Sequence, residues 1–308
     1  MRLAAYGALA ALGLIWGSNF VFVKWASPYI TPMQIVLLRV IFGLVPLLVF
    51  ALVTRSLRWQ HLRFAHHFLV MAILATAFYY VAFAKGTVLL LSSVAGMLSG
   101  AIPLFTFVTA WLFLRQEPIN RRSVLGTLLG FVGVLLIARP WSNDSSQVNI
   151  SGVLYMIAGS LSLGCSFVYA RKFISPLGLS PLVLTTYQIG LALFILMATT
   201  DLSGITRVFS DQRASLGLVF GLGLFGTGIA YLIYYFIVDQ LGAVAASGVT
   251  YIPPIVALLI GALWVGEPVR TIDVFAMLLI LIGVAVLQSG RTPVASYRAA
   301  DGAAVQKL

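Results

Sequence analysis

Long apolar stretches alternate with short polar segments along the whole chain. A helix needs about 20 apolar residues to cross the hydrocarbon core of a bilayer. The stretches are continuous, whereas the strands of a membrane barrel alternate between apolar and polar residues. Lipid offers no partner for backbone polar groups, so spanning segments of this kind form helices. The pattern predicts an all-α integral membrane protein with ten transmembrane helices at 5–26, 33–53, 67–85, 91–114, 123–138, 152–170, 181–199, 215–238, 243–264 and 273–288.

The second half of the chain repeats the first, because residues 95–138 match residues 245–288 at a constant offset of 150. Ile102-Pro103 aligns with Ile252-Pro253, and Glu117-Pro118 aligns with Glu267-Pro268. Five spans in each half make the second half enter the membrane from the opposite side, as in transporters built from inverted repeats. We expect a first five-helix repeat at 1–139, a linker at 140–151, a second, inverted five-helix repeat at 152–290 and a disordered cytoplasmic tail at 291–308.

A weaker match relates the second span of each repeat. Pro32 and Arg39 align with Pro181 and Gln188, and the two residues are seven positions apart in both repeats. The pattern therefore places an arginine and a glutamine at corresponding depths in the two halves.

Composition supports a membrane protein, because 61% of the residues are hydrophobic and only 9% are charged. Soluble domains carry about 25% charged residues. The net charge of +11 is a topology signal, since twelve basic residues in loops and tails fall on one side of the predicted spans and five on the other. Basic loops stay inside, which places both termini in the cytoplasm and argues against nucleic-acid binding.

Polar residues are unevenly distributed among the spans. The spans at 123–138 and 273–288 carry few, so we expect these two to pack outside and the other eight to surround a central pathway. The candidate binding surface is aromatic, because aromatic rings offer flat apolar area and a polar edge. Its members are Trp16, Tyr79, Tyr80, Tyr231 and Tyr235. Ordinary packing of these rings is the alternative.

One basic residue lies deeper than the others. Arg39 is about seven residues into the second span, where burial of an arginine costs about 2.5–3.5 kcal/mol on insertion scales. Structural hydrogen bonding and attraction of a substrate carboxylate both fit this position. Asn19 and Ser99 are candidates for contacts with the polar part of a solute.

Prolines interrupt the fourth and ninth spans. Pro103 in the fourth span corresponds to Pro253 in the ninth, which is followed by Pro254. Proline breaks the helical hydrogen-bond ladder, so these residues are candidate hinges, or they fix a bend.

The acidic residues and the motifs exclude several classes of protein. None of the eight acidic residues lies in the middle of a predicted span, so proton antiport through a central carboxylate is not expected. The three histidines, at 61, 66 and 67, fall in a basic loop, and we predict neither a metal nor a cofactor. There is no nucleotide-binding P-loop and no set of catalytic residues, so we do not expect an enzyme.

Two sequence features resemble a known family. The first is Trp16-Gly17-Ser18-Asn19-Phe20, and the second is the repeated proline followed by Glu-Pro, at Pro103 to Pro118 and Pro253 to Pro268. With these features the chain resembles EamA-type members of the drug/metabolite transporter superfamily. The resemblance implies a ten-span inner-membrane carrier that exports amino acids or other metabolites. The chain is also similar to YddG-like aromatic amino-acid exporters, which implies a solute site lined by Trp16, Asn19, Tyr79, Tyr80 and Tyr231.

The sequence therefore predicts a transporter that exports small metabolites, with aromatic and neutral amino acids favoured, by alternating access between the repeats. Its partners are the solute and the lipid bilayer, and we expect a monomer, with a dimer as the alternative. A drug or nucleotide-sugar carrier is the second interpretation, although a phosphorylated substrate would require several deep basic residues and only Arg39 qualifies. A membrane-embedded enzyme and a lipid scramblase or structural protein are two further classes.

Overall fold

The computed structural model describes residues 2–114, 120–140 and 148–290, apart from the side chains of Arg2 and of residues 242–247. Within these residues ten helical segments are long and apolar enough to span a membrane, and there is no β-strand. The all-α prediction is confirmed. Residues 141–147 of the predicted linker and the predicted tail at 291–308 lie outside the described residues.

The first repeat contains five spans, several of them built from more than one helical element. They are α1 (Arg2–Ala26), α2 (Pro32–Val53), a third span made of η1 (Trp59–Phe64), α3 (Ala65–Ala72), η2 (Ile73–Ala77) and α4 (Phe78–Leu89), a fourth made of α5 (Ser92–Ser99) and α6 (Ile102–Phe113), and α7 (Arg121–Ala138).

The second repeat has the same order of spans. They are a sixth span made of α8 (Ile150–Tyr169), η3 (Ala170–Ile174) and η4 (Ser175–Leu177), then α9 (Pro181–Thr199), an eighth made of α10 (Gln212–Leu216), η6 (Gly217–Ile229) and α11 (Ala230–Ser247), a ninth made of η7 (Gly248–Tyr251), α12 (Ile252–Ile260) and η8 (Gly261–Val265), and α13 (Thr271–Ser289). A short helix, η5 (Ile205–Ser210), lies between the seventh and eighth spans.

The second span of each repeat starts with the same local signal. Thr31 accepts a hydrogen bond from the Gln34 amide, and Ser180 accepts one from the Val183 amide, each at 3.3 Å. A proline follows each cap at the first helical position, where its missing N–H is not needed. The alignment of the two repeats therefore extends to the way in which these helices begin.

Three predicted boundaries are wrong, and one of them is the end of the sixth span, which continues to Leu177 rather than ending at residue 170. The third span starts at Trp59 rather than at residue 67, so the predicted basic loop is largely helical and includes His66 and His67 in α3. The predicted break at residues 239–242 lies inside α11, which continues to Ser247. Asp239 and Gln240 in this segment are polar, but polar residues end a helix only when the backbone hydrogen bonds have another partner.

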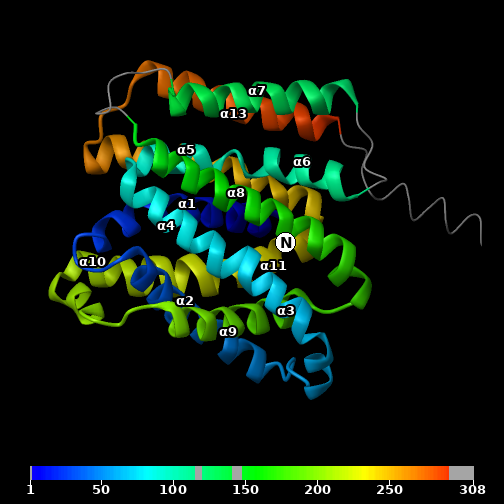
Figure 1. The fold of residues 1–308 in the computed structure, drawn as a ribbon. Coiled ribbons are helices and arrows are strands. Elements are labelled where there is room, and N and C mark those ends of the chain that lie inside the picture. The colour runs from blue at the N-terminus through cyan, green and yellow to red at the C-terminus, as the bar shows by residue number, and fades with distance from the viewer. Residues whose placement is uncertain (1, 115–119, 141–147, 291–308) are drawn as a thin grey trace, which may run out of the picture.

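The fifth spans of the two repeats lie side by side at one edge, and α2 and α9 lie on the opposite side of the bundle (Figure 1). Glycines bring α7 and α13 into backbone contact, because a Cβ on Gly283 would lie 2.6 Å from the Gly126 carbonyl oxygen. A buried ion pair between Arg139 and Asp273 joins the same two helices. The prediction that these spans pack outside is confirmed.

Spans four and nine also contact each other across the repeats. Gly96 on α5 faces Ala257 on α12, and Gly17 on α1 faces Val256 on α12. Glycines at such positions allow close approach of helices in a membrane. Each of these spans is interrupted just before its proline, at Gly100 and Ala101 in the fourth and at η7 in the ninth.

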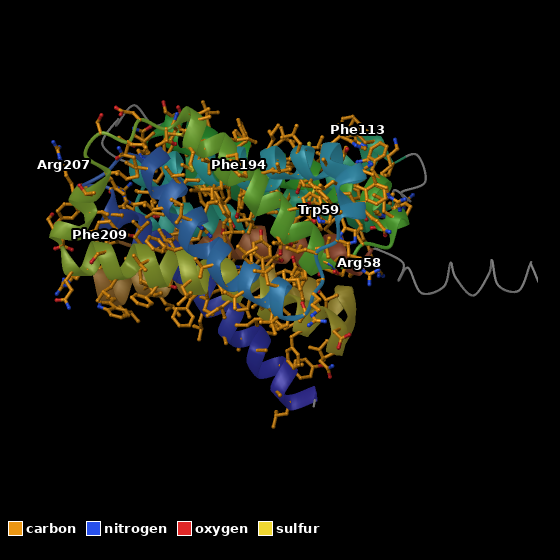
Figure 2. The ribbon with its side chains drawn as sticks, turned by 90° about the horizontal axis from the view of Figure 1, so that it is seen from below. Arg58, Trp59, Phe113, Phe194, Arg207 and Phe209 are labelled. Atoms are coloured by element: carbon orange, nitrogen blue, oxygen red, sulfur yellow. The ribbon has the colours of Figure 1, made fainter. Side chains whose placement is uncertain are left out.

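The exterior is apolar around the middle and polar at two ends (Figure 2). Arg58 and Trp59 lie at one end, and Arg207 and Phe209 lie at the other. Phe194 lies between the ends with 70% of its surface exposed, as expected for a residue that faces lipid. The ten spans of the described residues put the start of α1 and the end of α13 at the same face, called here the near face, and the opposite one is called the far face.

Candidate functional site

Arg39 lies inside the bundle, where groups from three helices hold it. Its Nε donates to the Thr227 hydroxyl at 2.9 Å, and its Nη2 donates to the Gly226 carbonyl at 3.3 Å. With the Asn19 amide oriented to satisfy its neighbours, Nη2 also donates to Asn19 Oδ1 at 3.2 Å. The guanidinium has five N–H groups, so these contacts leave the two on Nη1 for another acceptor.

The face of the same guanidinium lies on an aromatic ring. Arg39 Cζ is 4.0 Å from the centroid of the Tyr80 ring, within the range of a cation–π interaction. The Arg39 cluster therefore consists of Arg39, Asn19, Tyr80, Gly226 and Thr227. Among the described residues, no carboxylate forms an ion pair with Arg39.

The tyrosines of the predicted surface lie around this cluster. Tyr79 and Tyr80 have ring centroids 5.2 Å apart, and Tyr231 and Tyr235 have centroids 6.2 Å apart. Tyr80 interacts with Tyr231, which brings the two pairs together across the repeats. The Tyr235 hydroxyl is hydrogen-bonded to Thr185 on α9. Four of the predicted aromatic residues therefore share one region with Arg39.

A second polar bridge corresponds to the contact between Arg39 and Thr227. Gln188 on α9 donates through Nε2 to the Thr76 hydroxyl at 2.7 Å, and both residues are buried. Gln188 aligns with Arg39, and Thr76 lies near the position that aligns with Thr227. Each repeat thus uses its second span to reach a threonine on the third span of the other repeat.

Both threonines lie in π-helical segments. Thr76 is in η2 and Thr227 is in η6, where its hydroxyl donates to the Leu222 carbonyl at 2.9 Å. A π-helical segment widens the helix and turns side chains and carbonyl groups in new directions, and such segments are frequent at functional sites. Neither threonine is among the residues predicted for the site.

Other predicted residues lie elsewhere. Trp16 packs on Tyr234, with ring centroids 6.1 Å apart, in an apolar cluster that includes Leu12 and Val249. Ser99 is buried and donates to the Gly96 carbonyl of its own helix at 2.6 Å. Pro253 and Pro254 are buried at the start of α12, and Pro103 lies at the start of α6. These contacts leave the solute role of Trp16 and Ser99, and movement at the prolines, as hypotheses.

A further polar contact between the repeats lies at the far face, and its residues were not predicted from the sequence. The Glu267 carboxylate accepts hydrogen bonds from the amide and hydroxyl of Ser92, at 2.8 and 2.7 Å, and from those of Ser93, at 2.9 and 2.6 Å. Burial alone would raise the pKa of Glu267, but these four bonds hold that pKa below its ordinary value. We call this contact the Glu267 cap.

The described residues contain no group of three or more histidine, cysteine, aspartate or glutamate residues that could hold a metal ion. The Arg39 cluster offers instead one fixed positive charge, amide and hydroxyl groups, and aromatic rings. This set is suited to binding a small solute with an anionic group and an apolar part.

Known proteins resemble the chain over nearly its whole length. It is 28% identical to the uncharacterized transporter YdfC of Bacillus subtilis, over 82% of this chain and 80% of that one. It is 25% identical to the uncharacterized inner membrane transporter YedA of Escherichia coli K12, over 94% and 92% of the two chains. An uncharacterized transporter of Archaeoglobus fulgidus is also 25% identical, over 90% and 95%.

A solved structure has the same fold, with a TM-score of 0.59 at 19% identity, over 93% of this chain and 98% of that one. The profile of the EamA-like transporter family matches twice, at residues 3–139 and at residues 150–288. The duplication deduced from the sequence thus coincides with two copies of one family domain. The ten apolar spans and the inner-membrane relative indicate a multi-pass inner-membrane protein. The chain belongs to the EamA-like transporter family and is a membrane transporter.

Proposed function

We propose that this transporter exports small neutral or zwitterionic metabolites, with aromatic and other neutral amino acids favoured, by alternating access of its two inverted repeats. Both termini lie in the cytoplasm in this proposal. The observation that carries it is the Arg39 cluster, in which a fixed guanidinium without a carboxylate partner lies beside four tyrosines. The Nη1 group of Arg39 binds the carboxylate of the solute, and the tyrosine rings contact its apolar side chain.

The location of the cluster supports alternating access. Arg39 and Asn19 belong to the first repeat, whereas Gly226 and Thr227 belong to the second. Arg39 is the eighth residue of α2, so it lies about 10 Å along that helix from the far-face end. A solute bound there contacts both repeats, as in carriers whose repeats move against each other around a central site.

The charge of the site narrows the class of substrate. Nucleotide sugars and other phosphorylated solutes carry at least two negative charges and are usually bound by several arginines or lysines. The Arg39 cluster contributes one positive charge, which matches one carboxylate. The ammonium group of an amino acid can be held by hydroxyl groups and aromatic rings.

A transport assay in liposomes tests the proposal. Uptake of a radiolabelled amino-acid panel is measured with and without a pH gradient, for the unchanged chain and for Arg39→Ala. We expect saturable transport of neutral amino acids, and a loss in Arg39→Ala that is larger for amino acids than for analogues in which an amide replaces the carboxylate. Equal loss for both groups of solutes would reject the carboxylate role of Arg39. No transport of any amino acid by the unchanged chain would reject the substrate class.

A further inference from the structure

The Glu267 cap links the two repeats through the start of a helix. Leu91, the N-cap residue of α5, has no side-chain group that can accept a hydrogen bond, so the first amides of α5 need another acceptor. The Glu267 carboxylate of the second repeat supplies it, and its negative charge lies where the helix dipole favours one. Both serines are 1% exposed, and the Glu267 carboxylate that accepts from them is half-buried.

The backbone around Glu267 is shaped for this contact. Gly266 has a φ of 75°, and the Glu267 amide donates to the Gly261 carbonyl at 2.8 Å, which turns the chain back after η8. A Cβ on Gly261 would lie 2.6 Å from Glu267 Oε2 and 2.9 Å from the Ser93 Cβ. Glycine at both positions is therefore needed for the carboxylate to reach the two serines.

A lysine adds a favourable charge interaction to the Glu267 cap. Lys24, near the end of α1, donates through Nζ to the Val88 carbonyl at 3.0 Å and is attracted to Glu267. The ends of three spans and the loop before α13 are thereby held together at the far face.

The equivalent positions at the near face lack these features. At the offset of 150 that relates the repeats, the glutamate is retained as Glu117. The serines are replaced, since Ser92 and Ser93 align with Gly242 and Ala243. The two glycines are also replaced, because Gly261, which makes the close contact, aligns with Trp111, and Gly266, which forms the turn, aligns with Gln116. Residues 242 and 243 therefore offer no serine hydroxyl to a glutamate at position 117. The two faces are therefore unequal in the residues that can hold them closed.

We propose that the Glu267 cap is the contact that keeps the far face closed in the resting transporter, and that its release is required for the far face to open. This inference rests on the alternating access of the proposed function, but not on the identity of the substrate. Glu267 acts through the position of α5 and does not touch the solute. Loss of the cap changes the balance between closed and open states and leaves the Arg39 cluster in place.

Labelling of single cysteines in lipid nanodiscs tests the proposal, because it requires no substrate. Cys165→Ser removes the one cysteine of the chain. Val256→Cys then reports separation of α12 from Gly17, and Val249→Cys is a matched reporter seven residues nearer to the near face; both valines are buried. Each reporter is compared in the unchanged chain and in two cap variants, Glu267→Gln and the double variant Ser92→Ala/Ser93→Ala. Asp201→Asn and Thr199→Ala are controls from the far face, since they alter a carboxylate or hydroxyl that bonds only within its own local segment.

We expect maleimide to label Val256→Cys about tenfold faster in the cap variants, the effect of losing roughly one hydrogen bond to a charged group. Labelling of Val249→Cys should stay the same or fall, and the controls should change neither reporter. Unchanged labelling of Val256→Cys would overturn the proposal. Faster labelling of both reporters would also overturn it, because Glu267 would then stabilise the whole fold. An amino-acid assay that fails while Val256→Cys responds as expected would reject the substrate and leave the cap intact.

Discussion

The two polar bridges between the repeats occupy corresponding positions but differ in charge. In one, Arg39 of the first repeat reaches Thr227, and in the other, Gln188 of the second repeat reaches Thr76. The glutamine bridge shows that a neutral amide is sufficient to join a second span to a π-helical segment across the repeats. The arginine costs more to bury than the glutamine, and this difference supports the solute-binding role that we propose for its charge.

The strongest test of this comparison makes the two bridges alike. In Arg39→Gln the first repeat carries the residue that the second repeat already uses. We expect kcat/KM for a carboxylate-bearing solute to fall about 100-fold, which corresponds to the loss of a hydrogen bond to a charged group. The fold should be retained. Uptake into liposomes measures transport, and thermal unfolding in detergent measures the stability of the fold. Arg39→Lys keeps the charge but not the planar fork, so its kcat/KM should lie between the values of the unchanged chain and of Arg39→Gln. Full transport by Arg39→Gln would show that the charge is dispensable.

The converse test breaks the neutral bridge. Gln188→Ala removes the partner of Thr76, which is completely buried. We expect the free energy of unfolding to fall by about 1–3 kcal/mol, from the lost hydrogen bond and the space left behind. Solute preference should not change, because the charge of the Arg39 cluster is intact. If the thermal midpoint is unaltered while carboxylate selectivity is lost, the roles assigned to the two bridges are reversed.

The smallest expected effect concerns the acidity of the Glu267 cap at the far face. The pKa of Glu267 is lowered in the folded chain from an ordinary value of 4.5, so the cap contributes fully above that value and is lost as the pH falls through the lowered pKa. Labelling of Val256→Cys, relative to an exposed Thr199→Cys reporter that corrects for thiol ionisation, should be constant between about pH 5 and 8 and rise only in stronger acid. A rise near neutral pH would contradict the assignment of the cap to Glu267.

Much of the fold could be predicted from the sequence because lipid imposes one strong rule. A span must be long, apolar and helical, and the repeated Pro103 and Pro253 segments fixed the duplication. The exceptions have physical reasons. The third span begins early, because the segment around Trp59 is helical without being strongly apolar, and hydropathy alone does not register it.

The site was predicted less completely, because its residues meet through packing across the repeats. Arg39 and the tyrosines could be selected by their depth, whereas Trp16 was selected on the same ground and packs on Tyr234 instead. Thr76 and Thr227 were visible as polar residues, but the π-helical backbone that presents them to Gln188 and Arg39 has no signal in hydropathy. For the Glu267 cap there was a signal in the aligned sequences, since the Glu-Pro pair is present in both repeats, whereas Ser92-Ser93 of the first repeat align with Gly242-Ala243 of the second.

The edge formed by α7 and α13 limits how the protein can move. One helix of this pair comes from each repeat, their backbones touch at Gly126 and Gly283, and a buried ion pair ties their ends. In the alternating access that we propose, the repeats rotate against each other, so the edge with the least freedom to separate becomes the axis and displacement grows with distance from it. The opposite edge, where α2 carries Arg39 and packs beside α9, then travels farthest in each transport cycle (Figure 1).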